Sequence, residues 1–202
     1  MTRNPDLWLY IVHEAFWSAF GITLLVLKMI DRGRATVPTS AIVSEEAHAA
    51  RRSRALVAFH AVAFGIMYLG IGVAVFGMRV PFWFRGQRVV ASVVVGLGAV
   101  LVVSARVHFR SWRFRAQLDK GHELATGGPF RLLRHPIYMG LNLLALGSAI
   151  WAPTLMLWIA FAWMTIGGDL RGRAEERILE EAFGDSYRGY CRRTRRFVPY
   201  VY

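Results

Sequence analysis

The sequence has a single cysteine, Cys191, which excludes an intrachain disulfide and fits a reduced thiol. It has no G-x-G-x-x-G motif and no soluble stretch long enough for a βαβ unit, which excludes the common soluble folds that hold nucleotide-like cofactors. Charged residues are scarce, at 19% of the chain, whereas hydrophobic residues make up 55%. This balance is typical of a membrane protein when the apolar residues form long runs.

Long apolar runs are present at 7–30, 55–78, 89–105 and 136–168. Ionisable residues interrupt only the first two, as His13, Glu14 and Lys28 in one and His60 in the other. A helix needs about 20 residues to cross about 30 Å of hydrocarbon, so each of the first three runs predicts one span. We expect the first run to be retained as a membrane helix rather than cleaved as a signal peptide. Few charged residues precede it, and no small-residue cleavage pattern follows it.

The fourth run is too long for one upright span, and Trp151-Ala-Pro-Thr154 interrupts it near its middle. We interpret it as a tight helical hairpin, which gives an all-α integral membrane protein with about five transmembrane helices. A four-crossing version with one re-entrant arm is the alternative. No linker, repeat or low-complexity tract divides the chain, so we expect one domain over residues 1–202, with the cofactor-binding half at about 106–202.

The net charge of +12 is unevenly distributed along the chain. Twenty of the 25 basic residues fall in 31–54, in 106–134 and after Asp169. The positive-inside rule makes these segments cytoplasmic and puts the N-terminus outside. We therefore expect anionic membrane lipids rather than nucleic acid as partners, a multi-pass location such as a bacterial inner membrane, and no obligate protein partner.

The segment after the last apolar run predicts an amphipathic cytoplasmic helix. Its apolar residues recur at helical spacing between Leu170 and Phe183, and Gly184 is a suitable C-cap. The last span should continue into this helix or be closely followed by it.

Two cytoplasmic segments could hold a ligand. In the first, Gly127, Gly128 and Pro129 predict a turn with exposed backbone groups, and Pro136 suits the first turn of the next helix, directly after His135. In the second, Arg171 and Glu175 share one face of a helix and could bind a carboxylate and a cation. Taken singly, the alternatives are a solvated loop with arginine anchors and an exposed salt bridge of little energetic value.

Together, these segments resemble the isoprenylcysteine carboxyl methyltransferase family in a bacterial-type member, and its relatives the membrane phospholipid N-methyltransferases. The resemblance covers about eighty residues. It rests on an ordered set of motifs: His122-Glu-Leu-Ala-Thr-Gly-Gly-Pro-Phe130, Arg134-His-Pro-Ile-Tyr138 with Gly140, Arg171-x-x-x-Glu175-Glu176, Phe183-Gly184-x-x-Tyr187-x-x-Tyr190 and Arg196-Phe-Val-Pro199.

The resemblance implies S-adenosylmethionine as methyl donor, a lipophilic acceptor that enters from the bilayer, and no metal. Arg171 would orient the acceptor carboxylate and Glu175 would meet the donor's amino group. The implied donor contacts are His122, Glu123, Leu124, Ala125, Phe130, His135, Pro136, Ile137, Tyr138 and Glu175. Ala125 stands where valine is typical and Phe130 where tyrosine is typical, so a hydrogen bond from position 130 is lost while ring stacking is kept.

For the reaction, the resemblance implies carboxylate O-methylation of an isoprenylcysteine-like substrate. A carboxylate acceptor needs no general base. An N- or S-methyltransferase acting on a phospholipid or small molecule is the alternative. It would require a base, for which His135 and Glu176 are the catalytic candidates beside Arg171.

Two other classes remain open. An NADPH-dependent membrane reductase of the sterol type shares R-H-P-x-Y but resembles this chain less in the Glu175-Glu176 pair. A non-catalytic scaffold of the same fold is the other. The intramembrane His13, Glu14 and His60 lie at a costly depth, and we assign them no catalytic role.

Overall fold

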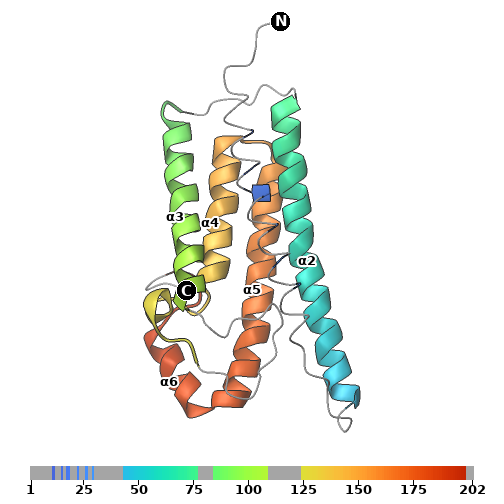
Figure 1. Ribbon diagram of the computed structural model, residues 1–202, viewed down its shortest axis with the longest axis vertical. Helices are drawn as coiled ribbons and strands as arrows, with labels where there is room; N and C mark the ends of the chain where they lie inside the picture. The colour runs from blue at the N-terminus through green and yellow to red at the C-terminus, as the bar shows by residue number, and fades with distance from the viewer. Residues whose placement is uncertain are drawn as a thin grey trace, which may run out of the picture.

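The computed structural model describes residues 43–76, 84–108 and 124–198, together with single residues between 11 and 29. These residues are helical, with one isolated bridge between Leu133 and Arg195 and no longer strand among them. The elements are α2 (Val43–Phe76), α3 (Gln87–His108), the 3-10 helix η1 (Gly128–Arg131), α4 (Pro136–Trp151), α5 (Leu155–Phe183) and α6 (Asp185–Arg193) (Figure 1). The expected all-helical class is confirmed for this part of the chain.

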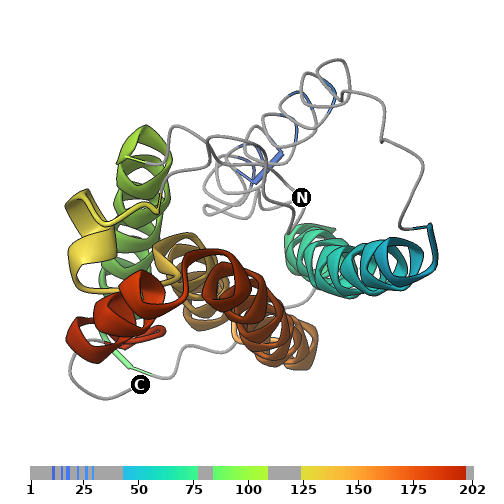
Figure 2. The same ribbon diagram turned by 90° about the horizontal axis from the view of Figure 1, so that it is seen from below.

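Four long helices stand side by side. α4 packs against α3 on one side and α5 on the other, and α5 packs against α2. Viewed along the helices, α3 and α2 therefore lie on opposite sides of the α4–α5 hairpin (Figure 2). The short elements η1 and α6 lie together at one end of this row (Figure 1). His13 and Glu14 lie outside the described residues.

Two described helices are long and apolar enough to cross a bilayer: α3, and α2 over Ala55–Ala74. Both expose large apolar side chains, such as Leu69 at 59% and Val100 at 67%, as expected for helices that face lipid. α4 is apolar but has only 16 residues. The described residues thus support a membrane protein and leave the expected number of five crossings as a prediction.

The break expected within the fourth apolar run is confirmed. α4 ends at Trp151, and the Thr154 side chain caps α5 by accepting a hydrogen bond of 3.3 Å from the backbone N–H of Leu157. α5 then runs for 29 residues without interruption, so the second arm and the expected tail helix are one helix. It ends at Gly184, the predicted C-cap, at φ +49°.

α3 and α4 approach closely because small residues face one another. A Cβ added to Gly98 would lie 2.7 Å from the carbonyl oxygen of Gly140, and one added to Gly147 would lie 3.0 Å from that of Ala91. Small residues that let two backbones touch are a common means of helix association in membranes. This contact fixes the start of α4, and with it the loop that precedes α4.

α2 and α5 are joined to each other by larger side chains. The Trp163 ring stacks on Phe59 with centroids 4.8 Å apart, and its indole N–H donates a hydrogen bond of 2.9 Å to the Phe59 carbonyl. The next residue of α2 is His60, which is buried against α5.

Candidate active site

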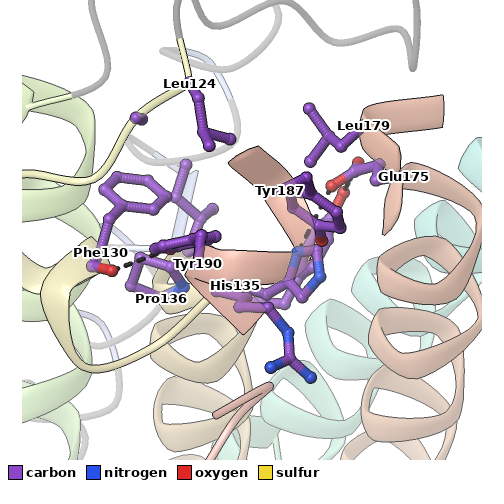
Figure 3. A pocket seen from close by; sticks show the side chains of 12 residues that line it. Leu124, Phe130, His135, Pro136, Glu175, Leu179, Tyr187 and Tyr190 are labelled. Atoms are coloured by element: carbon purple, nitrogen blue, oxygen red, sulfur yellow. Dashed lines mark hydrogen bonds and ion pairs between the residues drawn. The ribbon is translucent and has the colours of Figure 1, made fainter. Parts of the chain in front are cut away.

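A cavity opens where the loop before α4 meets the ends of α5 and α6. Its empty volume is about 560 Å³ including the open mouth. Figure 3 shows Phe130 on one side and Glu175 with Leu179 on the other. The lining residues are Leu124, Ala125, Phe130, Arg134, His135, Pro136, Ile137, Tyr138, Glu175, Leu179, Tyr187 and Tyr190.

Most of the residues expected to contact a donor are in this lining. From the loop they are Leu124, Ala125, Phe130 and the stretch 135–138, and from α5 the expected Glu175 joins them. His122 and Glu123 lie outside the described residues. The two candidate ligand-binding segments therefore meet around one cavity, although more than thirty residues separate them in the sequence.

His135 is clamped between two carboxylates. Its Nδ1 lies 3.5 Å from Glu175 Oε2 and its Nε2 lies 3.3 Å from Glu176 Oε1, and the ring is buried. Burial lowers the pKa of His135, but the hydrogen bonds to the two glutamates outweigh it and raise the pKa above its ordinary value. An imidazolium that donates from both nitrogens matches this arrangement.

Glu176 is bound by three cationic side chains and is not among the residues that line the cavity. Arg134 Nε donates to its Oε1 at 2.8 Å, and Arg196 donates to both oxygens, at 3.1 and 2.5 Å. Burial raises the pKa of Glu176, but the hydrogen bonds from His135, Arg196 and Arg134 outweigh it and hold the pKa well below its usual range. Because its oxygens are occupied in this way, Glu176 ties the C-terminal segment to α5.

The C-terminal segment is also joined to the loop by its backbone. Arg134 N–H donates to the Arg195 carbonyl at 2.7 Å, and Arg195 N–H donates to the Leu132 carbonyl at 3.1 Å. His135 N–H donates to the Arg196 carbonyl at 3.2 Å. The residues after α6 thus fix the position of His135, at the start of α4.

Glu175, Tyr138 and Arg171 form a second polar group, in which Glu175 and Tyr138 line the cavity and Arg171 is not among the lining residues. The Tyr138 hydroxyl donates to Glu175 Oε1, and Arg171 lies over the Tyr138 ring with its guanidinium carbon 5.0 Å from the ring centroid. Arg171 Nη2 is 3.9 Å from Glu175 Oε1, which is an ion pair longer than a hydrogen bond. Burial raises the pKa of Glu175, but the hydrogen bond from His135 and the charge of Arg171 outweigh it and lower the pKa.

Four lining residues had no assigned role in the sequence prediction: Arg134, Leu179, Tyr187 and Tyr190. Tyr187 and Tyr190 are three apart on α6, a spacing that puts both rings on one helix face. The Tyr190 hydroxyl donates to the Phe130 carbonyl at 2.8 Å and so attaches α6 to η1. The i,i+3 tyrosine pair was the available signal for these two residues.

A separate apolar cavity lies between α4 and α5, with an empty volume of about 1020 Å³, and its lining includes Asn142, Thr165 and Asp169. Asp169 and Arg171 are two residues apart on α5, so their side chains face different directions. This cavity is therefore on a different face of α5 from the Arg171 group.

Comparison with known proteins matches the part of the chain that contains α3, α4 and α5. The sequence model described as phospholipid methyltransferase matches residues 87–186, about half of the chain. Probable protein-S-isoprenylcysteine O-methyltransferases of two rice subspecies, Oryza sativa indica and japonica, are 28% identical over 130 residues, or 59% of this chain and 64% of each relative. Protein-S-isoprenylcysteine O-methyltransferase B of Arabidopsis thaliana is 31% identical over 86 residues, or 41% of this chain and 43% of the relative.

The matched parts span less than two thirds of the length of these curated relatives. The family model includes all of α3, α4 and α5, and therefore the loop and the helix end that build the cavity. The chain belongs to the isoprenylcysteine carboxyl methyltransferase family.

Proposed function

We propose that this protein is a methyltransferase that uses S-adenosylmethionine and acts on a lipophilic, membrane-partitioned acceptor, by carboxylate O-methylation of an isoprenylcysteine-like group. One observation carries the proposal: the loop with His135 and the end of α5 with Glu175 line a single cavity of about 560 Å³. The names of the plant relatives support this acceptor class.

The residues present fit such a donor. Glu175 supplies a carboxylate of lowered pKa for an ammonium group, and Phe130 and Tyr138 supply ring faces that attract a sulfonium by about 0.5 to 2 kcal/mol. The Tyr187 side chain, beside Cys191, also lines the cavity. When bound, S-adenosylmethionine supplies a methyl group whose C–S bond breaks as the acceptor's bond forms, with the electron pair left on sulfur.

The hydrogen-bond network favours a carboxylate acceptor over an amine or a thiol. An amine or thiol needs a general base, and the two sequence candidates were His135 and Glu176. His135 faces a carboxylate at each nitrogen, and Glu176 is bound by Arg134 and Arg196. Neither is placed to take a proton from an acceptor, and a carboxylate has none to lose. Arg171, whose nearest anion is 3.9 Å away, can hold a carboxylate by two parallel hydrogen bonds.

We further propose that the chain crosses the membrane five times, with the cavity on the cytoplasmic side. Two spans are supported by length and apolarity, and the arginines between 171 and 196 lie on α5, on α6 and in the segment after α6, beside the cavity.

Thermal unfolding of the purified protein in detergent tests the donor. S-adenosylhomocysteine should raise Tm and NADPH should not. The reverse pattern would replace the methyltransferase by a membrane reductase. Transfer of a tritiated methyl group from labelled donor to N-acetyl-S-farnesylcysteine tests the acceptor. Incorporation into a phospholipid extract but not into this probe would favour the N-methyltransferase alternative.

A further inference from the structure

His60 is a buried polar side chain whose ring lies against the backbone of Gly167 in α5. It is 2% exposed, and neither ring nitrogen makes a hydrogen bond within the described part of the chain. It lies inside the candidate span Ala55–Ala74, five residues from its cytoplasmic end, or about 7.5 Å along the helix. Polar side chains kept at such depth without a partner are commonly retained for a ligand or a proton.

The ring of His60 lies near the same tyrosine as Arg171 does. A Cβ added to Gly167 of α5 would lie 2.9 Å from His60 Nδ1, so the absence of a side chain at position 167 leaves room for the ring. The centroid of the His60 ring is 6.0 Å from that of Tyr138. Arg171, one helical turn beyond Gly167, lies over the same Tyr138 ring. α2 and α5 thus each bring one nitrogen-bearing side chain to Tyr138.

We propose that His60 is an acceptor-binding residue, which donates a ring N–H to the carboxylate that Arg171 orients. The inference rests on the proposed function and adds α2 to the site. A carboxylate accepts about four hydrogen bonds, so two from Arg171 leave capacity for one from a neutral imidazole. The polar end of the acceptor is then bound between α2 and α5, with its hydrocarbon part toward the bilayer.

Steady-state kinetics with the full-length protein in detergent test this role. The acceptor is N-acetyl-S-farnesylcysteine, and the inhibitor is N-acetyl-S-farnesylcysteamine, which has the same chain but no carboxylate. For His60→Leu we expect the KM for the acceptor to rise about ten- to hundredfold, as for loss of a hydrogen bond to a charged group. The inhibition constant of the cysteamine and the Tm shift caused by S-adenosylhomocysteine should match the wild type.

Three further variants make the comparison sharper. His60→Gln keeps an N–H donor and should raise KM less than His60→Leu does. Gly167→Ala places a methyl group against His60 Nδ1 and should raise KM while the histidine is still present. Val62→Ala, at an exposed position of the same helix, should leave KM unchanged.

Each other outcome has a distinct meaning. An unchanged KM in His60→Leu, or an equal rise in the inhibition constant of the cysteamine, overturns the assignment, because the ring then only packs or contacts the hydrocarbon chain. Loss of the S-adenosylhomocysteine shift together with a lower Tm also overturns it in favour of a structural role. A wild type that responds to S-adenosylhomocysteine but does not methylate the probe contradicts the carboxylate acceptor and His60 with it. A wild type with no such response refutes the proposed function itself.

Discussion

α3 and α2 flank the same helical hairpin but are packed against it differently. On the α3 side, Gly98 and Gly140 bring two backbones into contact, and the buried Gln87 side chain donates a hydrogen bond of 2.6 Å to the Ile150 carbonyl. On the α2 side, aromatic rings separate the helices and His60 remains without a hydrogen bond to the described residues. A close backbone contact fixes position and leaves no room for a ligand. Under the acceptor-binding role that we propose for His60, the α3 side acts as the support and the α2 side as the working face.

The largest expected effect is at Arg171, on the working face. Arg171→Lys keeps the charge but loses the planar pair of donors, so we expect kcat/KM to fall about 100-fold with Tm nearly unchanged. Methyl transfer to the farnesylcysteine probe measures it. Arg173→Lys, an exposed arginine on the same helix, is the control. Equal activity in the two variants would contradict the division between the faces.

Glu175→Gln should weaken the binding of S-adenosylhomocysteine about tenfold, because an ionised partner for the ammonium group becomes neutral. Isothermal titration calorimetry measures the change. Glu180→Gln, an exposed glutamate on the same helix, should bind like the wild type. If both variants keep wild-type affinity, Glu175 does not contact the ligand.

Gly98→Ala tests the support. The new Cβ would lie 2.7 Å from the Gly140 carbonyl oxygen, and because this is backbone the helices must shift apart, at a cost of about 1 to 3 kcal/mol. We expect a lower Tm in detergent and normal methyl transfer per folded molecule. In Gly96→Ala, the added Cβ would meet no neighbouring atom of the described residues within 4 Å. We expect its Tm to equal that of the wild type or to be slightly higher. Equal Tm values would show that the close contact does not limit stability.

The smallest expected effect is on the pH dependence of stability. The pKa of His135 is raised above 6.5, so its contribution is complete below that value and is lost as the pH rises through the folded-state pKa. The pKa values of Glu175 and Glu176 are lowered from 4.5, so their contribution is complete above that value and is lost as the pH falls. Tm should therefore be highest between about pH 5 and 6.5, where the contributions of all three groups are complete.

A substitution at Glu176 checks this assignment. Glu176→Gln removes one of the hydrogen bonds that raise the pKa of His135, so the alkaline fall in Tm should be smaller and should end at a lower pH. Differential scanning fluorimetry across pH compares the two proteins. An unchanged alkaline limb would mean that His135 does not titrate in the clamp.

Features that depend on neighbouring residues could be predicted from the sequence. The break at 151–154 and the end of α5 at Gly184 follow from local turn chemistry, and both are confirmed. The meeting of the 135–138 stretch with Glu175 came from an ordered set of motifs. Three features could not be predicted: the two-carboxylate clamp on His135, the binding of Glu176 by Arg196, and the direction in which His60 points. They depend on how the helices rotate against one another, which no local pattern encodes.

The pairing of Leu133 with Arg195 uses only backbone groups, so it does not depend on which side chain the exposed position 195 carries. A substitution of Arg195 should therefore leave the joint that locates His135 intact, whereas the buried Leu133 is also constrained by its packing. One edge of the cavity is thus set by the course of the main chain rather than by a particular amino acid at position 195.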